Sequence, residues 1–174
     1  MSNRIICHFS PYTFLLFSLL LACRQNPPAI DYEAEKAAIL RVVADETETY
    51  YRQDYAAWRN TYLDTSYFRM IGYWDGWPHK LEWRDGFAAL DSVKKKQFAA
   101  DKTIWKGSTE TRDNENLRIY PDVAWYTFDQ DSWEKDTRRF LGRSKELRIL
   151  EKHGGQWKIV YLGYYYLPMD TTAK

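Results

Sequence analysis

The sequence has few residues of the kinds that build disulfides, metal sites and nucleophilic centres. Of its 174 residues, only two are cysteine and three are histidine. Cys7 and Cys23 both fall in the first 23 residues, so the rest of the chain has no thiol for a disulfide, a thiolate nucleophile or a thiolate metal site. His79 and His153 lack the spacing of metal ligands, so we expect no metal site.

An excess of charge of one sign is also missing. The sequence has 25 Lys+Arg and 24 Asp+Glu, a net charge of +1, so no global field favours nucleic acid and none is an expected partner. The one basic run, Lys94–Lys96, is interpreted as a solvated helix face. There is neither the G-x-S-x-G motif of a nucleophile elbow nor a Gly-rich phosphate loop, and we expect no cofactor.

The first 23 residues have the pattern of an export signal. Arg4 precedes an apolar run that extends to Ala22 and ends at a cysteine. The last four residues, Leu20-Leu21-Ala22-Cys23, resemble the bacterial lipobox, a cleavage signal whose cysteine carries the lipid. An ordinary secretory signal or a short membrane anchor is the alternative interpretation.

A lipidated Cys23 would attach the protein to a membrane. We predict a lipoprotein signal peptide over residues 1–22, the lipidated cysteine and a tether over residues 23–30, and one domain over residues 31–170. The predicted location is the bacterial cell envelope. The outer membrane is favoured because Arg24, rather than an aspartate, follows the cysteine.

The first half of the domain has mainly helical patterns. Apolar residues at helical spacing predict a first helix, and Asp54 can cap a second, short one. Residues 67–73 and 81–84 predict two strands joined by a turn. Residues 85–100 predict a third helix with an apolar inward stripe.

The second half has strand patterns. Residues 103–112, 117–120 and 123–128 predict strands, and the charged segment over residues 129–143 predicts a loop. The C-terminal segment 147–166 predicts a hairpin at the centre of the sheet, because its second strand is largely apolar on both faces.

Simple alternation in the last strand would place Trp157, Ile159, Tyr161 and Tyr165 together on one face. Helices followed by antiparallel strands indicate an α+β domain with one sheet face covered by helices.

The order and spacing of these elements resemble the nuclear transport factor 2-like superfamily, in particular its SnoaL-like and ketosteroid-isomerase-like branch. The resemblance covers residues 33–166. The segments that carry it are DYAAWRNTYLD, WRDGFAALDSVKKK, NLRIYPDVAWYTF and LRILEKHGGQWKIV.

This resemblance implies an α+β cone, in which three helices pack in the concave face of a strongly curved, mainly antiparallel sheet and leave a pocket at the open end. It also implies a homodimer with sheets packed back to back, through either the Trp125/Thr127 or the Tyr126/Phe128 set. Isomerases of the superfamily carry their base on the first hairpin. The matching position here is Met70, which cannot accept a proton.

Glu46 is the candidate functional residue. It lies on the apolar face of the first helix, seven residues after Ile39 and four before Tyr50, so its side chain should face the core. A buried carboxylate needs partners or takes up a proton. The alternative is a structural glutamate paired with a core arginine, tyrosine or tryptophan.

The pattern predicts a binding module for a small apolar or aromatic organic ligand, with Glu46 as the orienting polar group. The expected ligand-binding residues are Tyr50, Trp58, Tyr62, Phe68, Met70, Trp83, Trp125, Arg148, Tyr161 and Tyr164. One alternative is an isomerase, dehydratase or cyclase that uses Glu46 as acid or base, with Arg148 or Tyr164 stabilising an enolate. A structural or partner-binding domain without a ligand is the other.

Overall fold

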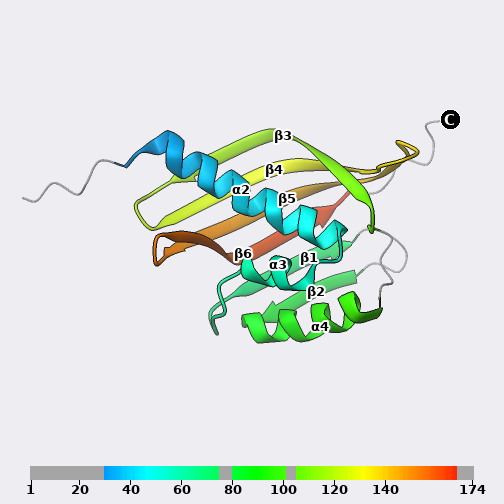
Figure 1. Ribbon diagram of the computed structural model, residues 1–174, viewed down its shortest axis with the longest axis horizontal. Helices are drawn as coiled ribbons and strands as arrows, with labels where there is room; N and C mark the ends of the chain where they lie inside the picture. Colours follow the sequence, from blue (N-terminus) through cyan, green and yellow to red (C-terminus); the bar gives the residue numbers. More distant parts are fainter. Residues whose placement is uncertain (1–29, 75–79, 101–104, 168–174) are drawn as a thin grey trace, which may run out of the picture. The chain divides into compact units, whose positions relative to one another are not determined.

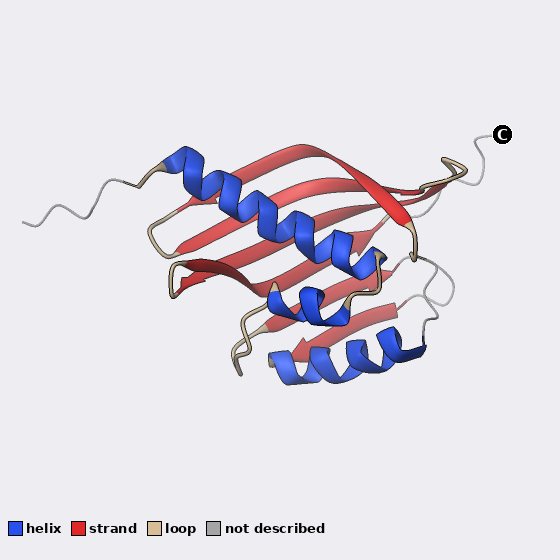
Figure 2. Ribbon diagram, in the orientation of Figure 1, coloured by secondary structure: helices blue, strands red, loops and turns tan. Residues whose placement is uncertain are grey.

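Three helices cover one face of a six-stranded sheet in the part of the chain that the structure describes (Figures 1 and 2). This computed structural model describes residues 30–74, 80–100 and 105–167. The helices are α2 (Tyr32–Tyr51), α3 (Tyr55–Asn60) and α4 (Phe87–Ala100). The strands are β1 (Arg69–Trp74), β2 (Lys80–Asp85), β3 (Ser108–Ile119), β4 (Val123–Glu134), β5 (Phe140–His153) and β6 (Gln156–Tyr166).

Several predictions fall outside the described residues. These are the signal peptide, the lipidated Cys23 and nearly all of the tether, together with the turn over residues 75–79 and the beginning of the strand expected from residue 103. Asp31 begins the compact unit that contains every described helix and strand. Among those helices, none is both long and apolar enough to cross a membrane.

The C-terminal hairpin lies at the centre of the sheet, as the sequence predicts. The strand order is β2-β1-β6-β5-β4-β3. Neighbouring strands are antiparallel except β1 and β6, which are parallel. The predicted α+β fold, with helices on one face of a mainly antiparallel sheet, is confirmed.

Aspartate side chains cap the N-termini of two helices, α2 and α3. Asp31 accepts a hydrogen bond from the Ala34 amide at 3.1 Å, and Asp54 accepts one from the Ala57 amide at 3.0 Å. Each bond satisfies an amide that the helix N-terminus leaves without an intrahelical partner. The second helix therefore begins where the sequence predicts.

The charged segment over residues 129–143 forms strand structure, so the predicted loop is wrong. β4 and β5 extend through it and leave only residues 135–139 between them. Gln130 is buried on the helix-covered face, whereas Asp131 on the opposite face lies 2.6 Å from Arg143 of the neighbouring strand. Cross-strand ion pairs and a polar inner face replace the apolar alternation that signals a strand.

β3 is one strand where the sequence predicts two. Its pairing with β4 shifts register between Asp113 and Asn116. Asn114 has φ of 53°, a left-handed conformation that asparagine adopts more easily than most residues. The interruption in the sequence pattern is therefore an irregularity within a continuous strand.

A β-bulge in β6 changes which of its side chains face the helices. Two neighbouring residues of β5 pair with Ile159 and Tyr161, so Val160 is an extra residue in β6. Ile159 and Leu162, on either side of the bulge, are both in the core. The simple alternation predicted for this strand is therefore wrong beyond Val160, and Tyr161 lies on the face away from the helices.

The core lies between the helices and the inner face of the sheet. Trp58 of α3 is 1% exposed, and its ring centroid lies 4.8 Å from that of Tyr62 and 5.5 Å from that of Phe98. Complete burial of a large apolar side chain stabilises a fold by roughly 1.5–3 kcal/mol. The aromatic residues of the helical half therefore hold the helices against the sheet.

Candidate functional site

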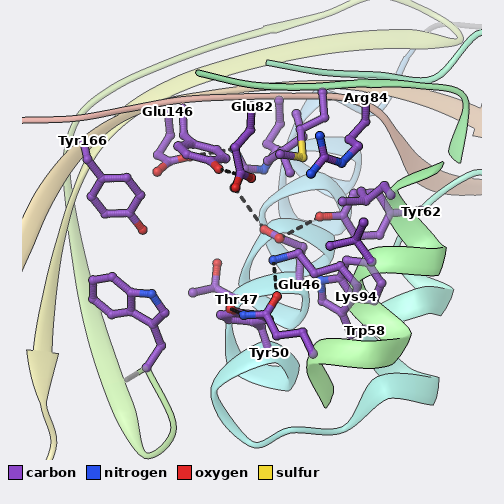
Figure 3. A pocket seen from close by; sticks show the side chains of 18 of the residues that line it. Glu46, Thr47, Tyr50, Trp58, Tyr62, Glu82, Arg84, Lys94, Glu146 and Tyr166 are labelled. Carbon is purple, nitrogen blue, oxygen red and sulfur yellow. Dashed lines mark hydrogen bonds and ion pairs between the residues drawn. The ribbon is translucent and has the colours of Figure 1, made fainter. Parts of the chain in front are cut away.

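A cavity of about 430 Å³ lies between the helices and the inner face of the sheet (Figure 3). Side chains of α2, α3 and α4 line one side, and side chains of β1, β2, β4, β5 and β6 line the other. The lining combines aromatic and aliphatic groups with several charged ones. Its volume is in the range of pockets that hold small organic molecules.

Glu46 of α2 is one of the buried residues of the pocket and is 8% exposed. The Tyr62 hydroxyl donates to its Oε1 at 2.8 Å, and Nη2 of Arg148 lies 3.1 Å from its Oε2. Figure 3 shows Tyr62 and Glu46 directed toward each other. The carboxylate is buried, as its position on the apolar helix face predicts.

Arg148 connects Glu46 to a second buried carboxylate. Its Nη1 donates to Oε2 of Glu146 at 2.8 Å, and the Ser144 hydroxyl donates to the other oxygen of Glu146. Arg148 is 4% exposed and Glu146 6%. We call Glu46, Tyr62, Ser144, Glu146 and Arg148 the buried ion network, since each of its charges is paired away from water.

The two carboxylates of the network have opposed pKa shifts. Burial raises the pKa of Glu146, and the nearby Arg148 and Ser144 offset this only in part. Burial also acts on Glu46, but the charge of Arg148 and the hydrogen bonds from Tyr62 and Arg148 outweigh it, so the pKa of Glu46 is lowered. As the pH falls, Glu146 therefore takes up a proton before Glu46 does.

One donor of the network has no partner. Nε of Arg148 is buried and meets no hydrogen-bond acceptor within the described residues. Leaving a buried donor unpaired costs roughly 1–3 kcal/mol. Arg148 lines the pocket with other atoms of its side chain, because this nitrogen itself is buried.

Tyr166 belongs to an aromatic wall of the pocket. Its ring centroid lies 4.4 Å from that of Trp74 and 5.7 Å from that of Trp105, and Tyr164 lies 5.5 Å away. Figure 3 places Tyr166 across the pocket from Tyr62. Rigid rings of this size present a flat apolar surface that suits an aromatic or alicyclic ligand.

Tyr164 crosses strand β1 to reach Glu82 of the edge strand β2. Gly72 of β1 pairs with Tyr164 on one side and with Glu82 on the other. The Tyr164 hydroxyl donates to Glu82 at 2.9 Å, and Lys80 lies 2.6 Å from the same carboxylate. Burial would raise the pKa of Glu82, but these two partners outweigh it and the pKa is lowered.

Most of the predicted site residues meet in this pocket. The lining includes Glu46, Tyr50, Trp58, Tyr62, Met70, Arg148 and Tyr164. They come from helices and strands far apart in the sequence, and the curved sheet brings them together (Figure 1).

Four predicted ligand-binding residues lie elsewhere. Phe68 is 0% exposed and packs in the core. Trp83, Trp125 and Tyr161 lie on the sheet face away from the helices, where they alternate with inward residues of their strands. The bulge at Val160 is the reason that Tyr161, which simple alternation would group with the buried Ile159, faces outward.

The pocket also contains three cations absent from the predicted set, which are Lys80 of β2, Arg84 of β2 and Lys94 of α4. We call the last two, which Figure 3 labels, the pocket cations. The interpretation of Lys94–Lys96 as a solvated face is wrong for Lys94, which is half-buried while the next two lysines are exposed. Lys94 follows the buried Leu90 by one helical turn, and this spacing is the signal that could have located it.

Glu146 is a further member of the site outside the predicted set. On β5 it alternates with Arg148 and Leu150, and all three are buried on the inner face. This alternation was the available signal for an inward carboxylate.

Within the described residues, no group of three or more His, Cys, Asp or Glu side chains is arranged to hold a metal ion.

No family model matches the sequence, and no curated protein matches it significantly. Solved structures do match. A protein of unknown function with a cystatin-like fold from Nostoc punctiforme has a TM-score of 0.62 and 14% identity, over 79% of this chain and 94% of the other. A nuclear transport factor 2-like protein of unknown function from Pseudomonas putida has a TM-score of 0.61 and 12% identity, over 82% and 93%.

A nuclear transport factor 2-like protein with a cystatin-like fold from Novosphingobium aromaticivorans covers 95% of this chain and 96% of its own, with a TM-score of 0.58 and 13% identity. The open sheet, its covering helices and the cavity between them define an α+β cone. The chain has the fold of the nuclear transport factor 2-like superfamily, as the resemblance of its sequence implies. Structural matches at identities this low show a shared fold and not a shared activity.

Proposed function

We propose that the protein is a lipid-anchored module of the bacterial envelope that binds a small organic ligand in its pocket. The main support is that the cavity reaches the buried ion network: Glu46, Glu146 and Arg148 line it although each is almost fully buried. A cavity with a large aromatic share and a few convergent polar groups is the usual composition of a ligand site.

Two features of the lining suggest how a ligand would be held. The aromatic wall around Tyr166 offers contact to an apolar body. Arg148, a charged residue of the lining, offers positive potential to an acceptor atom. The carboxylate of Glu46 already accepts bonds from Tyr62 and Arg148, so in this proposal it fixes the arginine that meets the ligand.

The envelope location rests on the sequence before the domain. An acylated Cys23 would hold the domain at the membrane through its lipid chains. The domain then needs no apolar surface of its own for attachment, and the pocket remains available to ligands from the surrounding solvent.

Thermal unfolding in a library of small aromatic and alicyclic compounds tests the binding function. A compound that binds the folded state raises the melting temperature, and the increase grows with the logarithm of the compound concentration once this exceeds the Kd. Leu162→Trp adds volume within the pocket, whereas Tyr161→Trp makes the matched change on the outer sheet face. We expect compounds that stabilise the wild type and Tyr161→Trp but not Leu162→Trp. Stabilisation of Leu162→Trp as well, or of none of the three proteins, would contradict the proposal.

A second candidate function is proton transfer by an isomerase, dehydratase or cyclase. The observation in its favour is the opposed pKa shift of two carboxylates that line one cavity. Glu146, whose pKa is raised by burial, would exchange the proton, and Arg148 would stabilise developing negative charge. Turnover found in a metabolite screen should then disappear in Glu146→Gln. Turnover that persists in this variant would exclude the role of Glu146.

A further inference from the structure

The pocket holds a local excess of positive charge in a chain that is almost neutral overall. Its charged lining consists of three glutamates, Glu46, Glu82 and Glu146, and four cations, Lys80, Arg84, Lys94 and Arg148. The whole sequence has a net charge of only +1. The arrangement of these charges, more than their sum, indicates where a ligand charge would be stabilised.

Every carboxylate of the pocket already has a cation. Arg148 pairs with both Glu46 and Glu146, at 3.1 and 2.8 Å. Lys80 pairs with Glu82 at 2.6 Å, and the Tyr164 hydroxyl donates to the same group. A cationic ligand would therefore compete with existing partners at each of these sites.

The pocket cations have weaker partners, although the charge of Lys94 helps to lower the pKa of Glu82. Nη1 of Arg84 donates to the Trp83 carbonyl at 2.6 Å, and Nζ of Lys94 donates to Gln97 at 3.2 Å and lies 4.5 Å from the Tyr50 ring centroid. Neither has a carboxylate within ion-pair distance among the described residues. Both side chains are only partly buried, so they keep some hydration until a ligand displaces it.

Arg84 and Lys94 come from adjacent elements. α4 follows β2 in the chain and lies beside it (Figure 1). An arginine offers several N–H donors in a planar fork and a lysine offers three, so the two can bind several oxygens of one anionic group or of two. Apolar and aromatic lining, such as Leu90 and Tyr50, lies next to them.

We propose that the ligand of this pocket is an organic acid, with an apolar body inside the cavity and a carboxylate or similar anionic group bound by Arg84 and Lys94. This inference rests on the proposed binding function and specifies its ligand class. The part of the ligand away from the anionic group would then place a neutral polar atom beside the buried ion network, because the charges of that network are already paired with one another.

The test uses three probes of nearly equal size: 2-naphthoate, its neutral amide 2-naphthamide, and cationic 2-naphthylmethylammonium. Each is titrated calorimetrically into the full chain in a non-ionic detergent, with protein-free micelles as the blank. We expect 2-naphthoate to bind about tenfold more tightly than the amide, the scale expected for hydrogen bonds to a charged group. The cation should bind most weakly.

Charge-removing variants locate the effect. Arg84→Gln and Lys94→Gln should each weaken naphthoate binding about tenfold and leave the amide unchanged. Lys95→Gln, on the exposed face of the same helix, is the control and should change neither. Equal affinity for acid and amide, or tighter binding of the cation, overturns the anion proposal while the binding function stands. If none of the probes binds, both proposals fail.

Discussion

The ring of Tyr164 lies directly against Gly72, and this contact allows a residue of the central strand β6 to hydrogen-bond the edge strand β2. A Cβ atom at position 72 would lie 2.1 Å from Cζ of Tyr164. The absence of a side chain on β1 therefore determines the position of a pocket residue on the neighbouring strand.

Gly72→Ala should displace the Tyr164 ring and break its bond to Glu82. We expect a loss of about 1–3 kcal/mol in the free energy of unfolding, the usual cost of overpacking a buried site. Urea denaturation measures it. In a Tyr164→Ala background the same glycine change should cost much less, because the clashing ring is gone. An equal cost in both backgrounds would mean that the backbone of β1, and not Tyr164, requires glycine.

The opposed pKa shifts of the buried ion network predict opposite pH trends. A lowered folded-state pKa gives Glu46 a stabilising effect that is present above the ordinary glutamate value of 4.5 and is lost as the pH falls through the folded-state pKa. The raised pKa of Glu146 has the reverse effect: its favourable contribution is present below 4.5 and is lost as the pH rises through the folded-state value.

Relative to the wild type, Glu46→Gln should therefore become more destabilising as the pH rises from 4 to 7, about the range in which buried carboxylates titrate. Glu146→Gln should become less destabilising over the same range. Chemical denaturation at several pH values measures both trends, with the exposed Glu48→Gln on α2 as control. If both buried variants showed the same trend with pH, the pKa values of Glu46 and Glu146 would not be shifted in opposite directions.

Replacing Cys23 by serine should release the protein from the membrane fraction. The serine cannot be diacylated, and no described helix could replace the anchor. Fractionation and mass spectrometry of the N-terminal peptide report the result. Membrane retention of Cys23→Ser would point to the alternative of an uncleaved N-terminal anchor.

The outer sheet face predicts a homodimer. Trp125, Ile149 and Tyr161 are neighbours across three strands and point away from the helices, so the outward set of β4 is Trp125/Thr127. A second copy would remove this apolar row from water, at roughly 25 cal/mol for each Å². Ultracentrifugation of the chain from Asp31 onward should show a dimer that Ile149→Lys dissociates. A wild-type monomer at roughly 50 µM, where a dimer with a Kd of about 1 µM would prevail, would contradict the interface.

The sequence predicts the fold well because the patterns that specify it are local. The caps, the apolar stripe of α2 and the C-terminal hairpin each occupy one continuous segment. Glu46 could be located for the same reason: a charged residue within an apolar helical stripe is visible from spacing alone. Lys94 occupies the equivalent position on α4, yet its place in a run of lysines concealed it.

The remaining parts of the site depend on contacts between distant segments. Gln130 and Ser132 make the inner face of β4 polar. The sequence of this segment therefore lacks the alternation of apolar and polar residues that identifies a strand. The partner of Tyr51 is Ser132, at 3.1 Å, and the partner of Glu46 is Arg148. No rule of local spacing connects such pairs, because the curvature of the sheet brings them together.

The extra residue Val160 also affects how this sequence must be compared with others. A related chain whose last strand lacks the bulge is aligned correctly only if a one-residue gap is placed opposite Val160. Without that gap, the other chain's pocket residues would be matched to Tyr161 and Tyr165 of the outer face. Aligned chains would then appear to have exchanged their binding residues for surface ones, although Leu162 and Tyr166 occupy the equivalent places in the pocket.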